Sequence, residues 1–124
     1  MKVYVGFQNV TNETFQNLIF KSEVLKKHQF IFGENVADEK DWLQKCEVMI
    51  ADVSYPTIPL GIEMGWADNY KVDIICVCVK GTAISSHLTR MCKEILIYTE
   101  VVDLVEKLER LFETQYNRNK RANK

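Results

Sequence analysis

The 124-residue sequence contains few residues that interrupt regular structure, with only 5 glycines and 2 prolines. Hydrophobic residues make up 47% of the chain and charged residues 27%, a composition that excludes disordered and collagen-like proteins. No apolar run approaches the ~20 residues that a membrane span needs, and residues 1–5 lead into a strand-like pattern with no leader. We therefore expect one untargeted, cytoplasmic domain that has no membrane partner.

The sequence also lacks an excess of charge of either sign, since 16 basic residues oppose 17 acidic ones. Residues 116–124 nevertheless hold no acid and four bases: Arg118, Lys120, Arg121 and Lys124. We expect residues 1–115 to form the domain and residues 116–124 to be a disordered basic tail. The body that remains is acidic and lacks the clustered Lys and Arg of a phosphate-backbone footprint, so we expect no nucleic-acid polymer as a partner.

The spacing of the four cysteines is not typical of a metal site. Cys76 and Cys78 lie in an apolar, strand-like run, where they share one face and pack as small hydrophobic residues. Zinc ligands usually form pairs separated by two to four residues, with a second pair elsewhere, and the sequence has no such arrangement. We expect no bound metal and four core cysteines: Cys46, Cys76, Cys78 and Cys92.

Short apolar runs alternate with helical patterns along the chain. Five runs are typical of strands: residues 2–6, 29–33, 47–52, 72–79 and 95–98. Helical spacing falls between and after them, near residues 15–25, 42–43, 60–70, 86–93 and 101–115. Largely apolar strands separated by helices are typical of a parallel sheet covered on both faces. We therefore expect a three-layer α/β/α fold with a five-stranded parallel sheet in the flavodoxin-like order 2-1-3-4-5.

The loop after the third predicted strand leads into an apolar helix that carries a carboxylate. Residues 52–67 read D-V-S-Y-P-T-I-P-L-G-I-E-M-G-W-A, which places Glu63 in the first turn of the predicted helix. One interpretation is a glutamate that is favoured by the helix dipole. The other is a carboxylate that Pro56 and Pro59 deliver to the strand ends, where ligands collect in such sheets. There it can attack a sugar carbon or stabilise an oxocarbenium-like centre.

Polar residues at neighbouring strands are further candidates. Tyr4 points to the opposite face of its strand from Val3 and Val5, and is either a buried strand tyrosine or a residue that reaches the site. Asp52 ends the third predicted strand, where an Asx-type turn is its usual role. Each polar residue after the second strand is a candidate acid, base or helix cap: Asn35, Asp38, Glu39 and Asp41.

Residues 52–67 resemble the segment (D/E)-V-(S/T)-x-P-S-x-G-x-G-x-E-x-G-x-A of the nucleoside 2-deoxyribosyltransferase family. Within that family, the chain looks most like the branch that hydrolyses 2'-deoxynucleoside 5'-monophosphates. Residues 34–37 (E-N-V-A) resemble the family's E-H-V-A, and residues 41–52 (D-W-L-Q-K-C-E-V-M-I-A-D) resemble its E-W-L-Q-x-A-D-V-V-V-A-E. The dipeptide Val3-Tyr4 resembles the family's opening strand tyrosine, so the resemblance extends over nearly the whole chain.

The resemblance implies an enzyme that needs no cofactor and cleaves the N-glycosidic bond of 2'-deoxynucleosides or their 5'-monophosphates. The glutamate matched by Glu63 attacks C1' of the deoxyribose, and water or a second base resolves the covalent ester. The tyrosine matched by Tyr4 orients this nucleophile, and the acid matched by Glu39 protonates the leaving base. The serine matched by Ser85 reaches the ligand phosphate of a neighbouring subunit, which implies a homodimer with a shared site. Our candidate substrate-binding residues are Gly6, Asn35, Asp38, Asp52, Thr57, Gly61 and Ser85.

The sequence departs from the family pattern at positions that bear on the substrate. The hydrolase branch has a G-S-x-R-G-G loop after its first strand, whereas residues 6–11 of this chain read G-F-Q-N-V-T. Pro59 stands in place of a glycine, and Asn35 in place of a histidine. These departures leave two alternatives open, an unphosphorylated deoxynucleoside as substrate and a non-catalytic homologue that binds a nucleotide or nucleoside. A flavin or dinucleotide binder has little support, because the same loop lacks a Gly-rich fingerprint.

Overall fold

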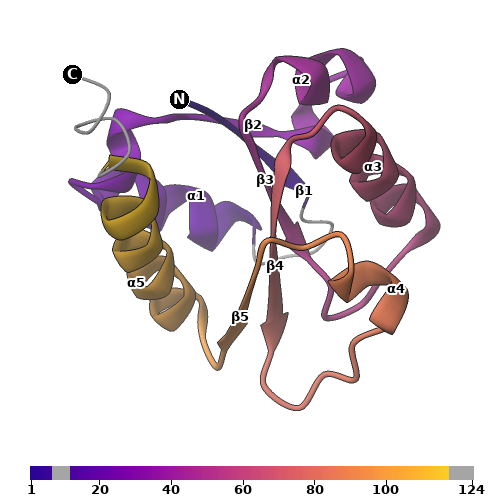
Figure 1. Cartoon of the computed structure of the whole chain (residues 1–124). Coiled ribbons are helices and arrows are strands. Elements are labelled where there is room, and N and C mark those ends of the chain that lie inside the picture. Colours follow the sequence, from indigo (N-terminus) through magenta and orange to yellow (C-terminus); the bar gives the residue numbers. More distant parts are fainter. Residues whose placement is uncertain (7–11, 118–124) are drawn as a thin grey trace.

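The computed structural model describes residues 1–6 and 12–117, which form a five-stranded sheet with helices on both faces (Figure 1). The strands are β1 (Lys2–Gly6), β2 (Gln29–Phe32), β3 (Val48–Asp52), β4 (Asp73–Val79) and β5 (Glu94–Tyr98). They lie in the order β2-β1-β3-β4-β5, and every neighbouring pair is parallel. The predicted α/β/α fold and strand order are therefore confirmed.

Helices cover both faces of this sheet (Figure 1). One side carries α1 (Asn12–Lys21) and α5 (Val101–Leu111), and the other carries α2 (Glu39–Lys45), α3 (Ile58–Asn69) and α4 (Ser86–Thr89). Shorter helical turns are η1 (Leu25–Lys27), η2 (Gly33–Asn35) and η3 (Phe112–Asn117), the last of which continues α5 as a π-helix. None of the described helices is long and apolar enough to cross a membrane.

Two helices are shorter than the apolar spacing predicts. The helix α1 ends at Lys21, and the hydroxyl of the buried residue Ser22 accepts a hydrogen bond from the backbone N–H of Leu25 at 3.1 Å. This bond begins the separate turn η1, in which Leu25 is still buried, so the apolar spacing continues although the α-helix does not. The helix α4 has only 4 residues, with Ser85 as its N-cap.

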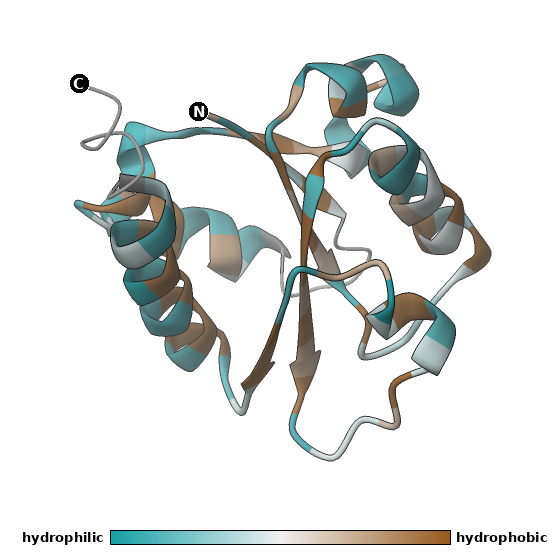
Figure 2. Ribbon diagram, in the orientation of Figure 1, coloured by the Kyte–Doolittle hydropathy of each residue, from teal (hydrophilic) through white to brown (hydrophobic). Residues whose placement is uncertain are grey.

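The sheet separates two hydrophobic clusters because successive side chains of a strand point to opposite faces. On the side of α1 and α5, Val3 and Ile50 pack with Leu108, and on the side of α2 and α3, Tyr4 packs with Met64. Every residue of β3 is buried, as expected for a central strand covered on both faces. Figure 2 shows this apolar character as brown in the central strands, while α5 carries both teal and brown residues.

The last helical turn overlaps the start of the predicted tail. The ring of Tyr116 lies 5.4 Å from that of Phe112, and its hydroxyl lies 3.3 Å from Oδ2 of Asp73. Residues 118–124, which hold all four bases of that tail, lie outside the described residues, as does the loop after β1 (residues 7–11). The disorder of the tail stays a prediction.

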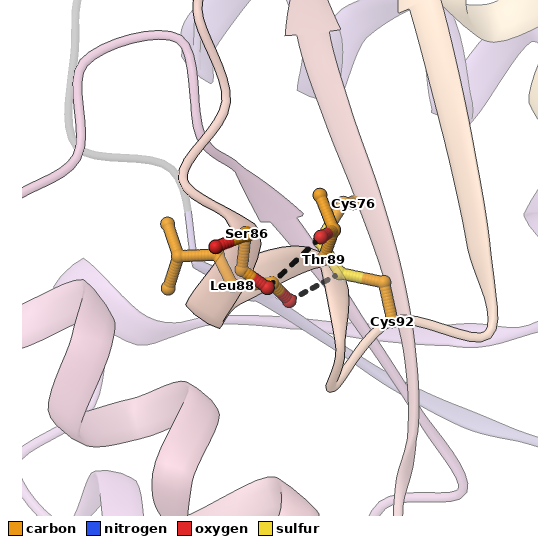
Figure 3. Close-up of a disulfide and its surroundings, with 5 residues drawn as sticks. All are labelled: Cys76, Ser86, Leu88, Thr89 and Cys92. Carbon is orange, nitrogen blue, oxygen red and sulfur yellow. Dashed lines mark hydrogen bonds between the residues drawn. A yellow bond between two sulfur atoms is a disulfide. The ribbon is translucent and has the colours of Figure 1, made fainter.

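The cysteines are buried or half-buried, but two of them are paired, which differs from our expectation. Cys76 in β4 and Cys92, just before β5, form a disulfide with their Cα atoms 5.9 Å apart (Figure 3). This pairing depends on the return of the chain through α4, which the sequence spacing does not reveal. Cys46 and Cys78 are free and buried, as predicted. Within residues 1–6 and 12–117, no cluster of three or more His, Cys, Asp or Glu could hold a metal ion.

Candidate active site

The start of α3 determines where Glu63 lies. Thr57 is the N-cap, and its Oγ1 accepts a hydrogen bond from the backbone N–H of Leu60 at 3.2 Å. Pro59 occupies an early helical position, where a missing N–H breaks no helical hydrogen bond. The helix therefore begins at Ile58, two residues before the predicted start, and Glu63 lies in its second turn. The helix-dipole interpretation of Glu63 is wrong, because that effect falls off within the first turn.

Glu63 is paired with Tyr4. The phenol of Tyr4 donates a hydrogen bond to Oε2 of Glu63, across 59 positions of sequence. Tyr4 is fully buried in the middle of β1, and Glu63 is only 6% exposed. The structure thus brings together the residue predicted to act as nucleophile and the residue predicted to orient it.

The surroundings of this pair determine its protonation. Burial raises the pKa of Glu63, the hydrogen bond from Tyr4 lowers it in part, and the negative charge of Glu39 raises it again. Burial and the bond to Glu63 raise the pKa of Tyr4, so its phenol keeps its proton and remains a donor. A carboxylate that is buried and held by a neutral donor is suited to stabilising positive charge that develops on a bound ligand.

The third predicted catalytic residue lies close to this pair. Glu39 is half-buried in the first turn of α2, and its charge raises the pKa of both Tyr4 and Glu63. The ammonium of Lys40 lies 5.8 Å from the centre of the Trp66 ring, so side chains of α2 and α3 are in contact. Strand β1, helix α2 and helix α3 therefore each contribute one of the three residues.

Gly33 is the site residue that our sequence candidates missed. It is buried, it follows β2 directly, and it lies against the Tyr4 phenol and the Glu63 carboxylate. The one feature of the sequence that could have indicated Gly33 is its place directly after β2, the strand that pairs with β1. Ligand sites collect at this edge of a parallel sheet, but the sequence did not show which side chain would face Gly33.

The two glycines predicted to bind substrate have different surroundings. Gly6 is the last residue of β1, and a Cβ there would lie 3.0 Å from Cε of Met49 and 3.1 Å from Cδ1 of Leu60. Gly6 is therefore required by the packing of α3 on the sheet. A Cβ on Gly61 would meet no atom within 4 Å, which leaves open space beside α3. Substrate binding by either glycine stays a prediction.

Three more candidates have exposed side chains. Asn35 ends η2, and Asp38 takes the N-cap position of α2 without making a side-chain capping bond. Ser85 caps α4, since its Oγ accepts a hydrogen bond from the backbone N–H of His87 at 3.2 Å. Their exposure leaves these three side chains accessible to a ligand or to a second subunit.

Asp52 lies on the opposite face of the sheet from Glu63. Its Oδ1 accepts the backbone N–H of Ser54 at 2.9 Å, which is the predicted Asx-type turn, and its Oδ2 accepts the hydroxyl of Tyr98 at 2.7 Å. The Oγ of Ser54 in turn accepts the backbone N–H of Val79 at 2.8 Å. These bonds join the carboxyl ends of β3, β4 and β5 at the entrance to α3. Contact of Asp52 with a substrate stays a prediction.

No protein-family model matches the sequence, and no curated protein matches it either. The structure defines a flavodoxin-like α/β protein with a buried carboxylate–phenol pair at the carboxyl edge of its sheet. Among solved structures, the chain is similar to that of Clostridium botulinum CMP N-glycosidase, BcmB. The TM-score is 0.68 at 20% sequence identity, over 88% of this chain and 99% of that chain.

Receiver domains have a similar structure. A CheY-like response regulator receiver domain protein from Methanospirillum hungatei JF-1 has a TM-score of 0.61 at 14% identity, over 95% of this chain and 96% of that chain. The signal receiver domain of a putative Luxo repressor protein from Vibrio parahaemolyticus has a TM-score of 0.58 at 14% identity, over 89% of this chain and 87% of that chain. These likenesses show the fold alone, so function has to be argued from the residues of the site.

Proposed function

We propose that this chain cleaves the N-glycosidic bond of 2'-deoxynucleosides or their 5'-monophosphates, with Glu63 as the nucleophile. The observation that carries the proposal is the buried hydrogen bond from Tyr4 to Glu63. A carboxylate that is desolvated by burial and oriented by a neutral donor fits a group that attacks an electron-poor sugar carbon. The similar structure of a CMP N-glycosidase supports cleavage of a bond of this type. The sequence resemblance of residues 52–67 supports the deoxyribose.

In the first step, a carboxylate oxygen of Glu63 forms a bond to C1' as the bond from C1' to the base nitrogen breaks. The electron pair of that bond leaves with the base, and the step starts from the protonated form of Glu39, whose carboxyl group gives the base a proton. The product is a 2-deoxyribosyl ester of Glu63, with Glu39 now ionised. The ionised Glu63 also stabilises the oxocarbenium-like transition state by its charge.

In the second step, a water oxygen attacks C1' and gives a proton to Glu39. The ester bond between C1' and Glu63 breaks, and its electron pair returns to the carboxylate. Two displacements at C1' retain the anomeric configuration. A second free base that replaces the water makes the same protein a transferase.

We also propose that two copies share the site. The exposed side of α3 and its leading loop carry three large apolar residues, Tyr55, Ile58 and Ile62, which are 79%, 81% and 48% exposed. Ser85 is exposed at the start of α4, on the same side of the sheet. A second copy that covers the apolar residues buries them, and the resemblance implies that it places its own Ser85 at the ligand phosphate.

The dimer is tested by comparing two substitutions of equally exposed apolar residues. We expect Ile58→Lys to shift the protein to monomers in sedimentation velocity. The matched control is Phe20→Lys on α1, which is 76% exposed on the other side of the sheet and leaves the dimer intact. A parent protein that sediments as a monomer at all concentrations overturns this part of the proposal.

The activity is tested with a panel of nucleosides and nucleotides. The panel holds the four deoxynucleosides, their 5'-monophosphates and CMP, each with and without free adenine, and base release is followed by chromatography. We expect release by the parent protein and by Glu106→Gln, an exposed-acid control, and a loss of at least about 1,000-fold in Glu63→Gln. Binding without base release by the parent overturns the proposal and favours the non-catalytic homologue.

A further inference from the structure

Gly33 lies where the phenol of Tyr4 meets the carboxylate of Glu63. A Cβ at this position would lie 2.8 Å from Cζ of Tyr4, closer still to the phenol oxygen, and 3.3 Å from Oε2 of Glu63. Carbon atoms in contact are normally about 3.5–4.0 Å apart, so a side chain here and the present position of Tyr4 exclude each other. The phenol therefore occupies space that exists because residue 33 is a glycine.

The requirement at Gly33 is for space and not for an unusual backbone conformation. Among the described glycines, Gly81 is the one with a positive φ, at 92°. The backbone of Gly33 thus lies in a region that alanine adopts without strain. The crowding at Gly33 also differs from that at Gly65, where a Cβ would meet no atom within 4 Å.

The phenol has little freedom to move away from a new side chain. Tyr4 is fully buried, with 0% of its surface accessible to solvent. It packs in the cluster that contains Leu43, Met49 and Met64. Protein interiors are close-packed, so a ring displaced here has to displace its neighbours as well. A displaced phenol also loses its bond to Glu63 and leaves a buried carboxylate oxygen without that donor.

We propose that Gly33 is a positioning residue of the proposed active site. Its missing side chain lets the Tyr4 phenol hold Oε2 of Glu63 from within the protein, which leaves the other carboxylate oxygen, Oε1, to form the bond to C1'. The inference rests on the proposed function and adds the residue that fixes which oxygen attacks. Gly33 acts through Tyr4 and does not itself take part in the displacement.

Kinetics test this role through the coupling of two substitutions. We expect Gly33→Ala to lower kcat about 10- to 100-fold with KM little changed, because a misplaced nucleophile affects the transition state more than binding. We expect Tyr4→Phe to cause a similar loss. In the Tyr4→Phe background, Gly33→Ala adds less than threefold, because the hydrogen bond to Glu63 that a displaced ring would break is already absent. Independent, multiplicative losses overturn the inference.

Thermal unfolding tests the same contact without any assay of activity. We expect Gly33→Ala to lower the Tm of the parent protein by several degrees, and to lower that of Tyr4→Phe by clearly less. The control is Gly65→Ala in the open part of α3, which leaves Tm unchanged or raises it because alanine favours a helix. Equal decreases in both backgrounds overturn the inference. Coupled decreases in a parent protein that releases no base support the seating of Tyr4 by Gly33 and overturn the proposed function.

Discussion

Glu63 is a buried carboxylate next to Met64 in α3, and the phenol of Tyr4, which packs in the apolar cluster on this side of the sheet, donates a hydrogen bond to it. Such a group weakens the fold in its charged form and strengthens it in its neutral form. The raised pKa of Glu63 shows that the folded protein favours the neutral form of this carboxyl group, and burial is the main cause. The residue therefore has the character of a functional group kept at the expense of stability.

The stability of the protein should respond to Glu63 with a definite sign. Because the pKa of Glu63 is raised on folding, its stabilising effect is complete below the ordinary pKa of a glutamate, about 4.3, and is lost as pH rises through the folded-state value. Glu63→Gln keeps an acceptor for Tyr4 and removes the charge. We expect this variant to unfold at higher urea concentration than the parent at pH 7 and at nearly the same concentration at pH 4. A lower midpoint at pH 7, with the slope unchanged, contradicts this account of Glu63.

Tyr4 should affect the pH dependence of the proposed reaction. Its hydrogen bond lowers the pKa of Glu63, so Tyr4→Phe raises that pKa, and the acidic limb of the profile of kcat/KM moves to higher pH. Loss of a hydrogen bond to a charged group corresponds to about 1.5–3 kcal/mol, or roughly a 10- to 150-fold loss of activity. The profile is measured between pH 4 and 9. A limb that stays in place or moves to lower pH shows that Tyr4 does not orient an ionised Glu63.

The sequence was informative about residues whose chemistry is carried by a side chain in a recognisable segment. Glu63 and Tyr4 belong to such segments, and the structure places them in contact. Gly33 and Tyr98 had no such signal. Gly33 matters because it has no side chain, which leaves space for the Tyr4 phenol. Tyr98 matters because its hydroxyl donates a hydrogen bond to the carboxylate of Asp52, 46 positions away in the sequence. Both depend on how the strand ends meet in three dimensions.

At the scale of elements, a hydrogen-bonded junction fixes the loop that leads into α3. Asp52 receives the hydroxyl of Tyr98 from β5 and the N–H of Ser54 from the loop, and Ser54 receives an N–H from the end of β4. Burial and the bond to Asp52 raise the pKa of Tyr98, so its hydroxyl remains a donor at all physiological pH values. The junction lies across the sheet from Glu63 and holds the start of the helix that carries it.

Removing one hydroxyl tests this junction. We expect Tyr98→Phe to lower the free energy of unfolding by about 1.5–3 kcal/mol, because the buried carboxylate of Asp52 loses a donor. Chemical denaturation followed by circular dichroism measures the change. Phe20→Leu, at a side chain of α1 that is 76% exposed, is the control and should be within about 0.5 kcal/mol of the parent. Equal effects of the two substitutions contradict a structural role for the Asp52–Tyr98 bond.

The helix α4 is held to the sheet by few contacts. It has no buried residue, and the apolar side chains that anchor this segment, Ile84, Leu88 and Met91, are only partly buried. The disulfide between Cys76 and Cys92 closes this segment onto β4 (Figure 3). In a reducing compartment such as the predicted cytoplasm, a cysteine pair of this kind is kept in the reduced, thiol form.

Reduction of this disulfide should therefore weaken the fold. A loop of this length corresponds to about 3 kcal/mol in the chain-entropy model. We expect a reductant to lower the free energy of unfolding of the parent by about 2–4 kcal/mol, and to have no effect on Cys92→Ser, which lacks the bond in both conditions. Thiol titration before and after reduction verifies the redox state. A parent that gains two thiols and keeps its stability contradicts this prediction.

For the whole molecule, the alternation of apolar runs and helical patterns was sufficient to predict the layers and the strand order. Parallel strands need crossover connections, and the chain is too short for many arrangements, so sequence pattern and topology are closely linked. The ends of α1 and α4 were harder to predict. The end of α1 is followed by a hydrogen bond that the Ser22 hydroxyl accepts from the backbone N–H of Leu25, and α4 is followed by the disulfide at Cys92, and neither feature alters the apolar spacing.

The fold itself does not determine the activity, because receiver domains and a CMP N-glycosidase both resemble it. The central claim is that Glu63 forms a covalent bond to the sugar. It is tested most directly by acid-quenching the protein during turnover of a deoxynucleotide and locating the adduct by peptide mass spectrometry. We predict a mass increase of one 2-deoxyribosyl 5-phosphate group on Glu63, absent from Glu63→Gln. An adduct on another residue, or undiminished base release by Glu63→Gln, would contradict the account.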